Sequence, residues 1–561
     1  MTMNQHDVFQ RPAGYWLKRA QRQKQSGNLL RAAVLERHAL RADESSDEAW
    51  ESYVLTLRQL SCYEASNREA FAALAQSPER RELYGLIGQN LLAMGLRPAG
   101  MDALNIYLAT PVDGFLPDWH DDAYDLACLC DQIPPRRRKA RLDGLLAAAA
   151  RQIAQNRLDK ARDSLIRAGK TPYQGPSAQR ELLWALYRLQ KQQPDKCMER
   201  LLSAIRIRPR SAQIHASAAN VFASLGMPDM ARMELINAAR FAVSPAQMLA
   251  VLLASDSIRA PHIVCAMLRR MLRHQANRFP VLYNLCVCML RLGKLDEAAQ
   301  HIHLCREIDP DDVSGELLFS RVMAMQESGL TPAQVRRAGW QASWYGACSP
   351  QELSAVVAPI MAALSDGPAQ LAQGVCDDRR LRLHFLHLLS MPLDWPARLL
   401  AAVGESLPQD ECERLMREVL LQHPGPSAAK LHAVSALHAL GVPPPYATWQ
   451  DNRIAWADPT RAPQSTPAFR PRLLTLRIHR AQKLCPRDGG IALWAMETVH
   501  RMSRRQRSQV IADPARVWPL AFAIRYRFIR GMEPLHIDLN RLGRGRAWAL
   551  NDALRLLRTV K

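Results

Sequence analysis

The chain has 561 residues, a formal net charge of +21 and a sequence pI near 9.8. This length exceeds what one compact core holds, so we expect several domains or a stack of repeats, and the charge favours an anionic partner. Aromatic residues make up only 6%, and almost no segment alternates polar with β-branched residues, which excludes a mainly β protein and predicts an all-α fold.

The N-terminal segment, residues 1–10, is polar and lacks the apolar stretch of a signal peptide. No apolar run approaches the ~20 residues that a bilayer-spanning helix needs. We therefore expect a cytoplasmic protein with no membrane partner. The 12 cysteines include no C-x-x-C pair, so we expect reduced, buried thiols, with no metal site and no cofactor.

A period of 34 residues is clearest in 279–312. Cys286 occupies a small position of a first helix, Gly293 the turn between two helices, and Ala298 the place where the second helix crosses the first. Small residues let antiparallel helices approach closely, and glycine allows the turn between them. The segment therefore predicts one antiparallel helix pair that ends near Pro310.

The same landmarks recur upstream at the same spacing. The turn positions hold Gly27, Gly95, Asn156, Gln192 and Gly226. The small packing positions hold Ala20, Ala32, Ala39, Ala73, Ala149, Ala161, Ala168, Ala185, Cys197, Ala204, Ala219, Ala231 and Ala238. Recurrence in phase argues against a generic helical protein with Ala-rich helices. It predicts units near 13–46, 47–80, 81–114, 142–175, 178–211, 212–245, 245–278 and 279–312.

This pattern resembles the tetratricopeptide repeat (TPR). The resemblance implies an α-solenoid of antiparallel helix pairs, a TPR-like superhelix over 13–312, whose first helices form a concave groove for a protein or peptide. The lysine and asparagine clamp by which some relatives grip chaperone C-termini is not found at the matching positions, so that partner is not expected. The residues expected to line the groove are Gln179, Leu182, Leu186, Gln213, Ala216, Asn220, Tyr283, Val287 and Arg291.

Three further features interrupt or follow the repeats. The acidic stretch from Asp118 to Asp125 suits a helix N-terminus better than a metal site. Residues 313–440 keep a helical pattern without the 34-residue landmarks, so we expect degenerate helical repeats. In 441–472, a proline cluster precedes aromatic and β-branched residues on both sides of Asp451-Asn452, which predicts a short β-hairpin and then a Pro-rich linker.

The end of the chain, residues 473–561, predicts a basic C-terminal helical domain. From residue 466 onward, 20 lysines and arginines face 6 acidic residues, which gives a net +14 of the total +21. A short helix from Pro534, a turn at Gly543 and a longer helix from Ala547 to Val560 are similar to a helix-turn-helix. Leu539, Leu542, Leu550 and Leu554 would hold its two helices together.

The helix-turn-helix resemblance implies four residues that reach phosphates or base edges: Arg544, Arg546, Asn551 and Arg555. The turn is one residue short of the usual spacing, and Arg544 stands where the pattern prefers a small apolar residue. The alternative interpretation is a basic helical cap that closes the last apolar face of the solenoid.

The sequence has no P-loop and no G-x-G-x-x-G, H-E-x-x-H or G-x-S-x-G motif, so we predict no catalytic residues and no enzyme. The leading hypothesis is a non-enzymatic protein-binding scaffold or adaptor that uses the concave groove. The alternative is a nucleic-acid-binding transcriptional regulator whose tail binds DNA, RNA or another polyanion.

Overall fold

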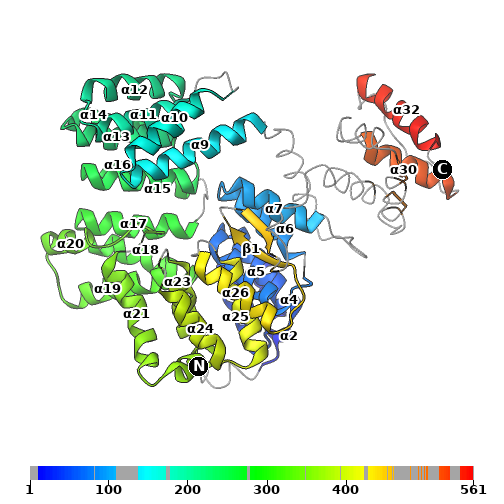
Figure 1. Ribbon diagram of the computed structural model, residues 1–561. Helices are drawn as coiled ribbons and strands as arrows, with labels where there is room; N and C mark the ends of the chain where they lie inside the picture. Colours follow the sequence, from blue (N-terminus) through cyan, green and yellow to red (C-terminus); the bar gives the residue numbers. More distant parts are fainter. Residues whose placement is uncertain are drawn as a thin grey trace. The chain divides into compact units, whose positions relative to one another are not determined.

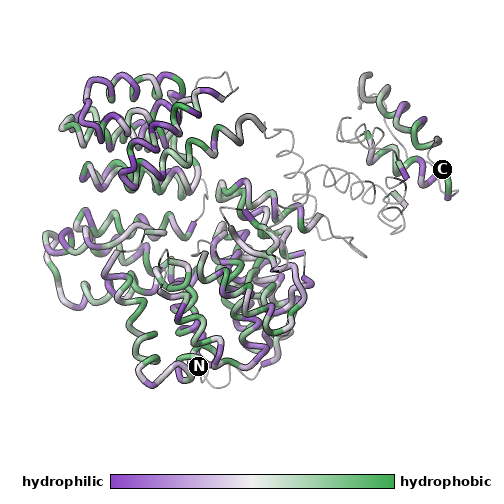
Figure 2. The backbone as a smooth tube through the Cα atoms, in the orientation of Figure 1, coloured by the Kyte–Doolittle hydropathy of each residue, from purple (hydrophilic) through white to green (hydrophobic). Residues whose placement is uncertain are grey.

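The computed structural model describes residues 11–80, 82–108, 137–171, 177–273, 278–347, 349–391, 393, 395–422, 427–450, 453–457, 459, 481, 491, 494–495, 498, 501–502, 517–530 and 544–559. In this part of the chain the regular elements are helices, apart from one antiparallel pair of strands (Figure 1). The predicted all-α class with a short hairpin is confirmed. Hydrophobic and hydrophilic residues alternate along many helices (Figure 2), a pattern typical of helices with one buried face.

The chain divides into two compact units, and each unit combines segments that are distant in sequence. The first unit comprises Met1–Ser66, Ala93–Gly95 and Ile133–Leu388, and the second comprises Asn67–Leu92, Leu96–Gln132 and Leu389–Lys561. The domains expected from the sequence, 13–312, 313–440, 441–472 and 473–561, follow the chain in order and do not coincide with these units.

The first unit contains all or most of a long series of helices. They are α2 (Ala13–Gln25), α3 (Leu29–Ala42), α4 (Asp47–Gln59), α9 (Arg137–Ala154), α10 (Leu158–Gly169), α11 (Ala178–Gln190), α12 (Pro194–Ile207), α13 (Ala212–Ser224), α14 (Pro228–Phe241), α15 (Pro245–Ile258), α16 (Pro261–Arg273), α17 (Arg278–Leu292), α18 (Leu295–Ile308), α19 (Val313–Glu327), α20 (Pro332–Gly339), α21 (Pro350–Leu364), α22 (Pro368–Asp377) and α23 (Arg379–Ser390). Helix α5 (Tyr63–Gln76) begins in this unit and continues into the second.

Successive helices form antiparallel pairs. In each pair we call the earlier helix the first helix (α9, α11, α13, α15 and α17) and the later one the second helix (α10, α12, α14, α16 and α18). The two members of each pair pack together, and neighbouring first helices from α9 to α15 also contact one another. Each predicted unit contains one such pair. Helices α9 to α18 therefore form an α-solenoid of antiparallel helix pairs, as the repeat pattern indicates.

The turns between paired helices lie at the predicted repeat position, and the residue at that position adopts a left-handed backbone. The residues with positive φ are Gly27 (77°), Gly95 (82°), Asn156 (55°), Gln192 (56°), Gly226 (73°) and Gly293 (80°). Ser61 makes the same turn after α4 with a φ of 58°, but serine carries no sequence signal for it.

The small packing residues lie where two helices cross. All of those predicted are buried, with Ala32, Ala161, Ala231 and Ala298 at 0% exposure. Because they have little or no side chain beyond Cβ, the helix backbones can approach closely. Seven cysteines in the described residues are buried free thiols: Cys62, Cys197, Cys265, Cys286, Cys288, Cys305 and Cys412.

Helix starts follow from local chemistry. Ser177 and Ser211 cap the first helices α11 and α13, where each side-chain oxygen accepts the backbone N–H three residues later, at 3.3 Å and 3.5 Å. The second helices α12 and α14 begin instead with Pro194 and Pro228, whose fixed φ suits the first turn. The repeat therefore specifies both its turns and its helix starts.

The second unit contains all or most of α6 (Leu83–Ala93), α7 (Arg97–Leu108), α24 (Pro396–Ser406), α25 (Gln409–Leu421), α26 (Ser427–Ala439), α30 (Val517–Ile529) and α32 (Arg544–Thr559), with strands β1 (Tyr446–Gln450) and β2 (Arg453–Ala457). Gln450 pairs with Arg453, which leaves the predicted two-residue turn at 451–452, outside the described residues. Strand β1 packs on α25 and α26, and β2 packs on α7.

The hairpin is tied to its neighbours by charged side chains. Arg453 of β2 forms an ion pair with Asp102 of α7, with Nη2 at 2.7 Å from Oδ1. Lys430 of α26 donates to the carbonyl oxygens of Trp449 and Gln422, the latter at 2.9 Å. Burial lowers the pKa of Lys430 to about 8. The hairpin is therefore an integral part of this unit.

Candidate functional site

The first-helix surface of α11, α13 and α15 is the candidate site. Gln179 and Gln213 are exposed near the starts of α11 and α13, while Leu186 and Asn220, one at the same position of each repeat, are half-buried. Two other predicted residues, Leu182 at 7% and Ala216 at 2% exposure, are buried and serve the packing of these helices. Four of the six residues predicted on α11 and α13 thus reach the surface.

Helix α15 adds a residue that the sequence analysis missed. Leu253 lies 33 positions after Asn220 and is 47% exposed. A signal existed, because Leu186, Asn220 and Leu253 are separated by about one repeat each, but the unit near 245–278 lacks its other landmarks. We name Gln179, Leu186, Gln213, Asn220 and Leu253 the groove strip.

Asn220 is the polar centre of the groove strip. Within the described residues, its Oδ1 atom is buried and has no hydrogen-bond partner. An unsatisfied buried amide oxygen costs about 1–3 kcal/mol, and a ligand whose binding turns this half-buried amide toward its own N–H donor would recover that free energy. The strip therefore offers apolar contact at Leu186 and Leu253 and one acceptor between them.

The three residues predicted on α17 do not reach the surface. Tyr283, Val287 and Arg291 are 1%, 0% and 4% exposed. They are covered by α20 and by the residues that follow it, which pack directly on α17. The expectation that these three side chains line an open groove is therefore wrong, because the chain itself occupies this surface.

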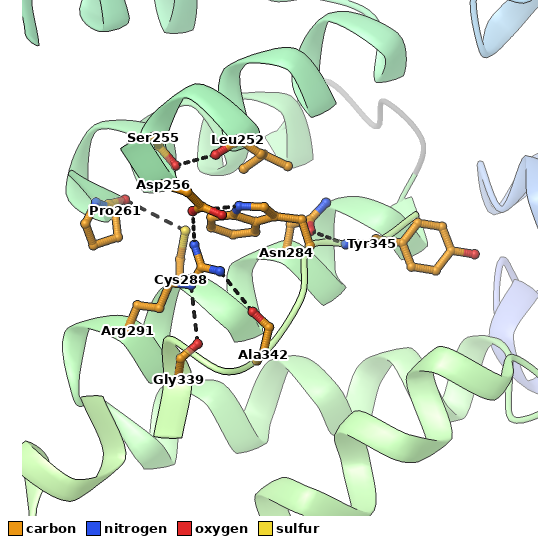
Figure 3. A network of polar contacts seen from close by, with 11 residues as sticks. Leu252, Ser255, Asp256, Pro261, Asn284, Cys288, Arg291, Gly339, Ala342 and Tyr345 are labelled. Carbon is orange, nitrogen blue, oxygen red and sulfur yellow. Dashed lines mark hydrogen bonds and ion pairs between the residues drawn. The ribbon is translucent and has the colours of Figure 1, made fainter. Parts of the chain in front are cut away.

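Arg291 holds the covering residues in place (Figure 3). Its Nε donates to the carbonyl oxygen of Gly339 at 3.3 Å and its Nη2 to that of Ala342 at 2.9 Å. Its Nη1 forms an ion pair with Asp256 of α15, which also accepts a hydrogen bond from Trp344 Nε1 at 2.9 Å. The guanidinium lies 3.9 Å from the Trp344 ring centroid, a cation–π contact.

Tyr345 completes the covering. Its backbone N–H donates to Asn284 Oδ1 at 2.9 Å, and its hydroxyl donates to Asp312 Oδ2 at 2.9 Å. Its ring contacts those of Phe279 and Tyr283, with centroids 5.5 Å and 5.3 Å away. Burial raises its pKa well above the ordinary value. We name residues 339–346 the covering segment.

A close approach makes this packing possible. A Cβ added to Gly339 would lie 2.5 Å from the Leu290 backbone carbon and 2.6 Å from the Arg291 nitrogen. Only glycine therefore fits between α20 and α17. The sequence did not reveal the covering, because Gly339, Ala342 and Tyr345 bond to residues 48, 51 and 61 positions earlier.

A buried ionic pair supports α13 behind the groove strip. His215 is 3% exposed; its Nδ1 bonds to Glu234 of α14 and its Nε2 lies 3.0 Å from the carbonyl oxygen of Pro209. Both neighbours accept hydrogen bonds, so the ring donates from both nitrogens as an imidazolium. The bond to Glu234 raises the pKa of His215, against the opposing effect of burial.

The four nucleic-acid candidates all lie on α32, which begins at Arg544 rather than at Ala547 as expected. Asn551 and Arg555 are exposed and lie one turn apart. The side chains of Arg544 and Arg546, the expected helix from Pro534 and the acidic stretch from Asp118 all fall outside the described residues.

The opposite face of α32 is apolar and packs on α30. Leu550, Ala553 and Leu557 join Trp518 and Phe522 in one buried cluster, and Leu554 packs against it. This core explains why Asn551 and Arg555 point outward. In the described part of the chain, α30 is the helix that α32 packs on, and the predicted helix before Gly543 is not part of that description.

The described residues contain neither a metal-binding cluster nor a single helix that could span a bilayer. No group of three or more histidine, cysteine or acidic side chains is placed to hold a metal ion there. No single helix among them is long and apolar enough to cross a bilayer; α21 and α22 meet the requirement only together, with a bend of 115° at their break.

No protein-family model and no curated protein matches the chain. Solved structures similar to it include PilF of Pseudomonas aeruginosa (15% identity over 36% of this chain and 90% of that one, TM-score 0.25). Others are PilW, a widely conserved type IV pilus biogenesis factor (18%, 38% and 98%, TM-score 0.25), and yeast Tom70 (13%, 92% and 96%, TM-score 0.19). At such TM-scores these likenesses carry no argument about partner or function.

Proposed function

We propose that the protein is a non-enzymatic scaffold that binds a polypeptide segment on the groove strip of α11, α13 and α15. The observation that carries the proposal is Asn220, whose amide oxygen lacks a hydrogen-bond partner within the described residues and lies between two accessible leucines. A backbone N–H satisfies this oxygen, and apolar side chains cover Leu186 and Leu253.

The covering segment supports a polypeptide as the ligand class. On α17, the Asn284 amide oxygen accepts a backbone N–H from a non-helical stretch of chain, and Phe279 and Tyr283 hold the aromatic side chain of Tyr345. A first helix of this protein thus binds polypeptide through an asparagine acceptor beside an apolar surface. The groove strip offers the same two elements without an occupant from the described chain.

The experiment selects ligands from a random peptide library displayed on phage, with the full chain as bait. The affinity of each selected peptide, made synthetically, is then measured by fluorescence anisotropy. We expect Leu186→Glu and Leu253→Glu each to weaken binding about tenfold or more, because each places a charge against an apolar contact. Asn220→Ala removes the acceptor and should weaken binding by a smaller factor.

A matched control is Met361→Glu on α21, since Met361 is 49% exposed and lies outside the groove strip. This variant should bind like the wild type. Failure to select any peptide, or equal affinities for all four variants, would refute the proposal.

Nucleic-acid binding by the tail is the second candidate. It is supported by the net +14 after residue 465 and by the outward position of Asn551 and Arg555 on one face of α32. Phosphate contacts release counterions, so log affinity should fall steeply with log salt concentration. Affinity purification with and without nuclease separates this candidate from the first.

A further inference from the structure

Three successive second helices, α10, α12 and α14, carry the same three residue types at the same turns. Each has an aspartate in its first turn, a large aliphatic residue seven positions later and a basic residue four positions after that, which for α10 is the C-cap residue. All nine are exposed. They are Asp159, Ile166 and Lys170 in the first repeat; Asp195, Leu202 and Arg206 in the second; Asp229, Ile236 and Arg240 in the third. We name these nine residues the second-helix ridge.

The spacing places each set of three on one helix face. At about 100° per residue, positions i, i+7 and i+11 fall within about 40° of one another, and the two charges stand about 16 Å apart along the axis. The ridge is therefore three parallel rows across three helices: an acidic row, an apolar row and a basic row.

The charges alone have a local explanation, since acids favour helix N-termini and bases favour C-termini. The exposure of the apolar row has no such local explanation. Ile166, Leu202 and Ile236 are 37%, 39% and 53% exposed, and Met233, one turn before Ile236, is 52% exposed. Exposed large aliphatic side chains at one position of three successive second helices indicate a surface that another molecule covers.

The apolar row does not continue on the next two second helices, α16 and α18. At the corresponding position, α16 has Arg269 and α18 has His303. The exposed aliphatic residues are thus confined to three consecutive repeats and do not recur at this position of the next two.

We propose that the second-helix ridge is a homodimer interface, and that its occupant is the same ridge of a second copy of this chain. A two-fold axis parallel to the three rows places the acidic row of one copy opposite the basic row of the other, in both directions. The same axis places the apolar row of one copy against the apolar row of the other. Each helix then runs antiparallel to the same helix of the second copy. Leu202 then packs near Leu202 of its copy, flanked by two contacts between Asp195 and Arg206.

Charge complementarity favours a second copy over other occupants. A partner of a single sign would be repelled by one of the two charged rows, whereas the ridge is complementary to itself. Exposed ion pairs contribute little affinity and mainly set the orientation, so the apolar row supplies most of the association. Three helices form a small interface, near the ~1,000 Å² lower limit for specific complexes, and a weak, concentration-dependent dimer is expected.

Sedimentation velocity of the full chain over a dilution series gives the first test. The wild type should shift from monomer to dimer as its concentration rises. Leu202→Glu places a carboxylate against its own copy at the centre of the ridge and should raise the dimer dissociation constant about tenfold or more. Met361→Glu, a substitution of comparable exposure on α21, should leave the constant unchanged.

Charge reversal gives the sharper test, because a second reversal can restore the self-association that a single reversal weakens. Asp195→Arg and Arg206→Asp should each weaken self-association, since like charges then face each other. The double variant exchanges the two signs and should recover the wild-type constant. A mixture of the two single variants should form the heterodimer in preference to either homodimer.

Circular dichroism of each variant verifies that these surface substitutions leave the helices folded. A wild-type chain that stays monomeric at every concentration overturns the proposal. So does a dimer that Leu202→Glu leaves intact, or a double variant that fails to recover. None of these results bears on the groove strip, which lies on the first helices.

Discussion

Arg453 and Asp102 form an ion pair across 351 positions of sequence. Two nitrogens of the guanidinium donate to the two carboxylate oxygens, and the bond to Asp102 raises the pKa of Arg453. The Asp102 side chain is 1% exposed, whereas that of Arg453 is half exposed. The pair joins helix α7 to strand β2 within the second unit.

Removing Arg453 and removing Asp102 should lower the free energy of unfolding by different amounts. Arg453→Ala takes from a buried carboxylate its charged partner, and we expect the free energy of unfolding to fall by about 2–3 kcal/mol. Asp102→Ala leaves a half-exposed guanidinium that water hydrates, so its loss should be about 1 kcal/mol. Urea denaturation of the full chain measures both.

The control is Glu413→Ala, which breaks the pair between Glu413 and Arg417 on α25, where the two side chains are 33% and 18% exposed. Pairs one helical turn apart contribute about 0.5 kcal/mol or less. Equal losses for all three variants would contradict the special role of the pair between α7 and β2.

His215 should make stability depend on pH. Its pKa in the folded protein is raised, first by the hydrogen bond to Glu234, above the ~6.5 of an unfolded histidine. The stabilisation is therefore complete below about pH 6.5 and is lost as the pH rises through the folded-state pKa. His215→Gln lacks the imidazolium, so its unfolding free energy should approach that of the wild type as the pH increases. A difference that is constant over this pH range would show that His215 is not charged in the folded chain.

The covering segment should depend on the shape of the Arg291 guanidinium. Lysine cannot donate to Gly339, Ala342 and Asp256 with the same geometry. Losing one charged hydrogen bond costs about 1.5–3 kcal/mol, so Arg291→Lys should speed hydrogen exchange of the Tyr345 amide by about 10- to 100-fold. The control is Lys294→Ala, because Lys294 follows the Gly293 turn at the end of α17 and its side chain is 51% exposed. Unchanged exchange in Arg291→Lys would mean that other contacts hold the segment.

Local and distant features differed in how far the sequence revealed them. Gly226 and Gln192 were predicted to be turns because the repeat places the same backbone requirement at a fixed interval, and their positive φ angles agree. The same periodicity predicted Leu186 as a groove residue, and this side chain is half-buried. Arg291 was misplaced because its cover is about 50 residues away, and the sequence spacing records no such contact. The partnership of Asp102 with Arg453 is likewise invisible to any local pattern.

The tail should carry any affinity for nucleic acid. Deleting 466–561 removes a net +14 and should abolish retention on a DNA or heparin column at ~0.15 M salt, where the Debye length is about 8 Å and only clustered charge retains the protein. Replacing Arg544, Arg546 and Arg555 by Ala should flatten the salt slope by up to about three if all three contact phosphate. Unchanged binding by the triple variant would exclude α32 as the contact helix.

The second unit has a consequence for synthesis on the ribosome. Helix α7 leaves the exit tunnel early, but strand β2 follows it by 351 residues. At about 5–20 residues per second, Asp102 waits roughly 20–70 seconds for Arg453. Throughout this interval the surface of α7 that β2 will cover is open to the solvent, while the repeats between them can already pair with their neighbours. The surface of α7 that carries Asp102 therefore stays uncovered on the nascent chain for longer than the surfaces that pack between adjacent repeats.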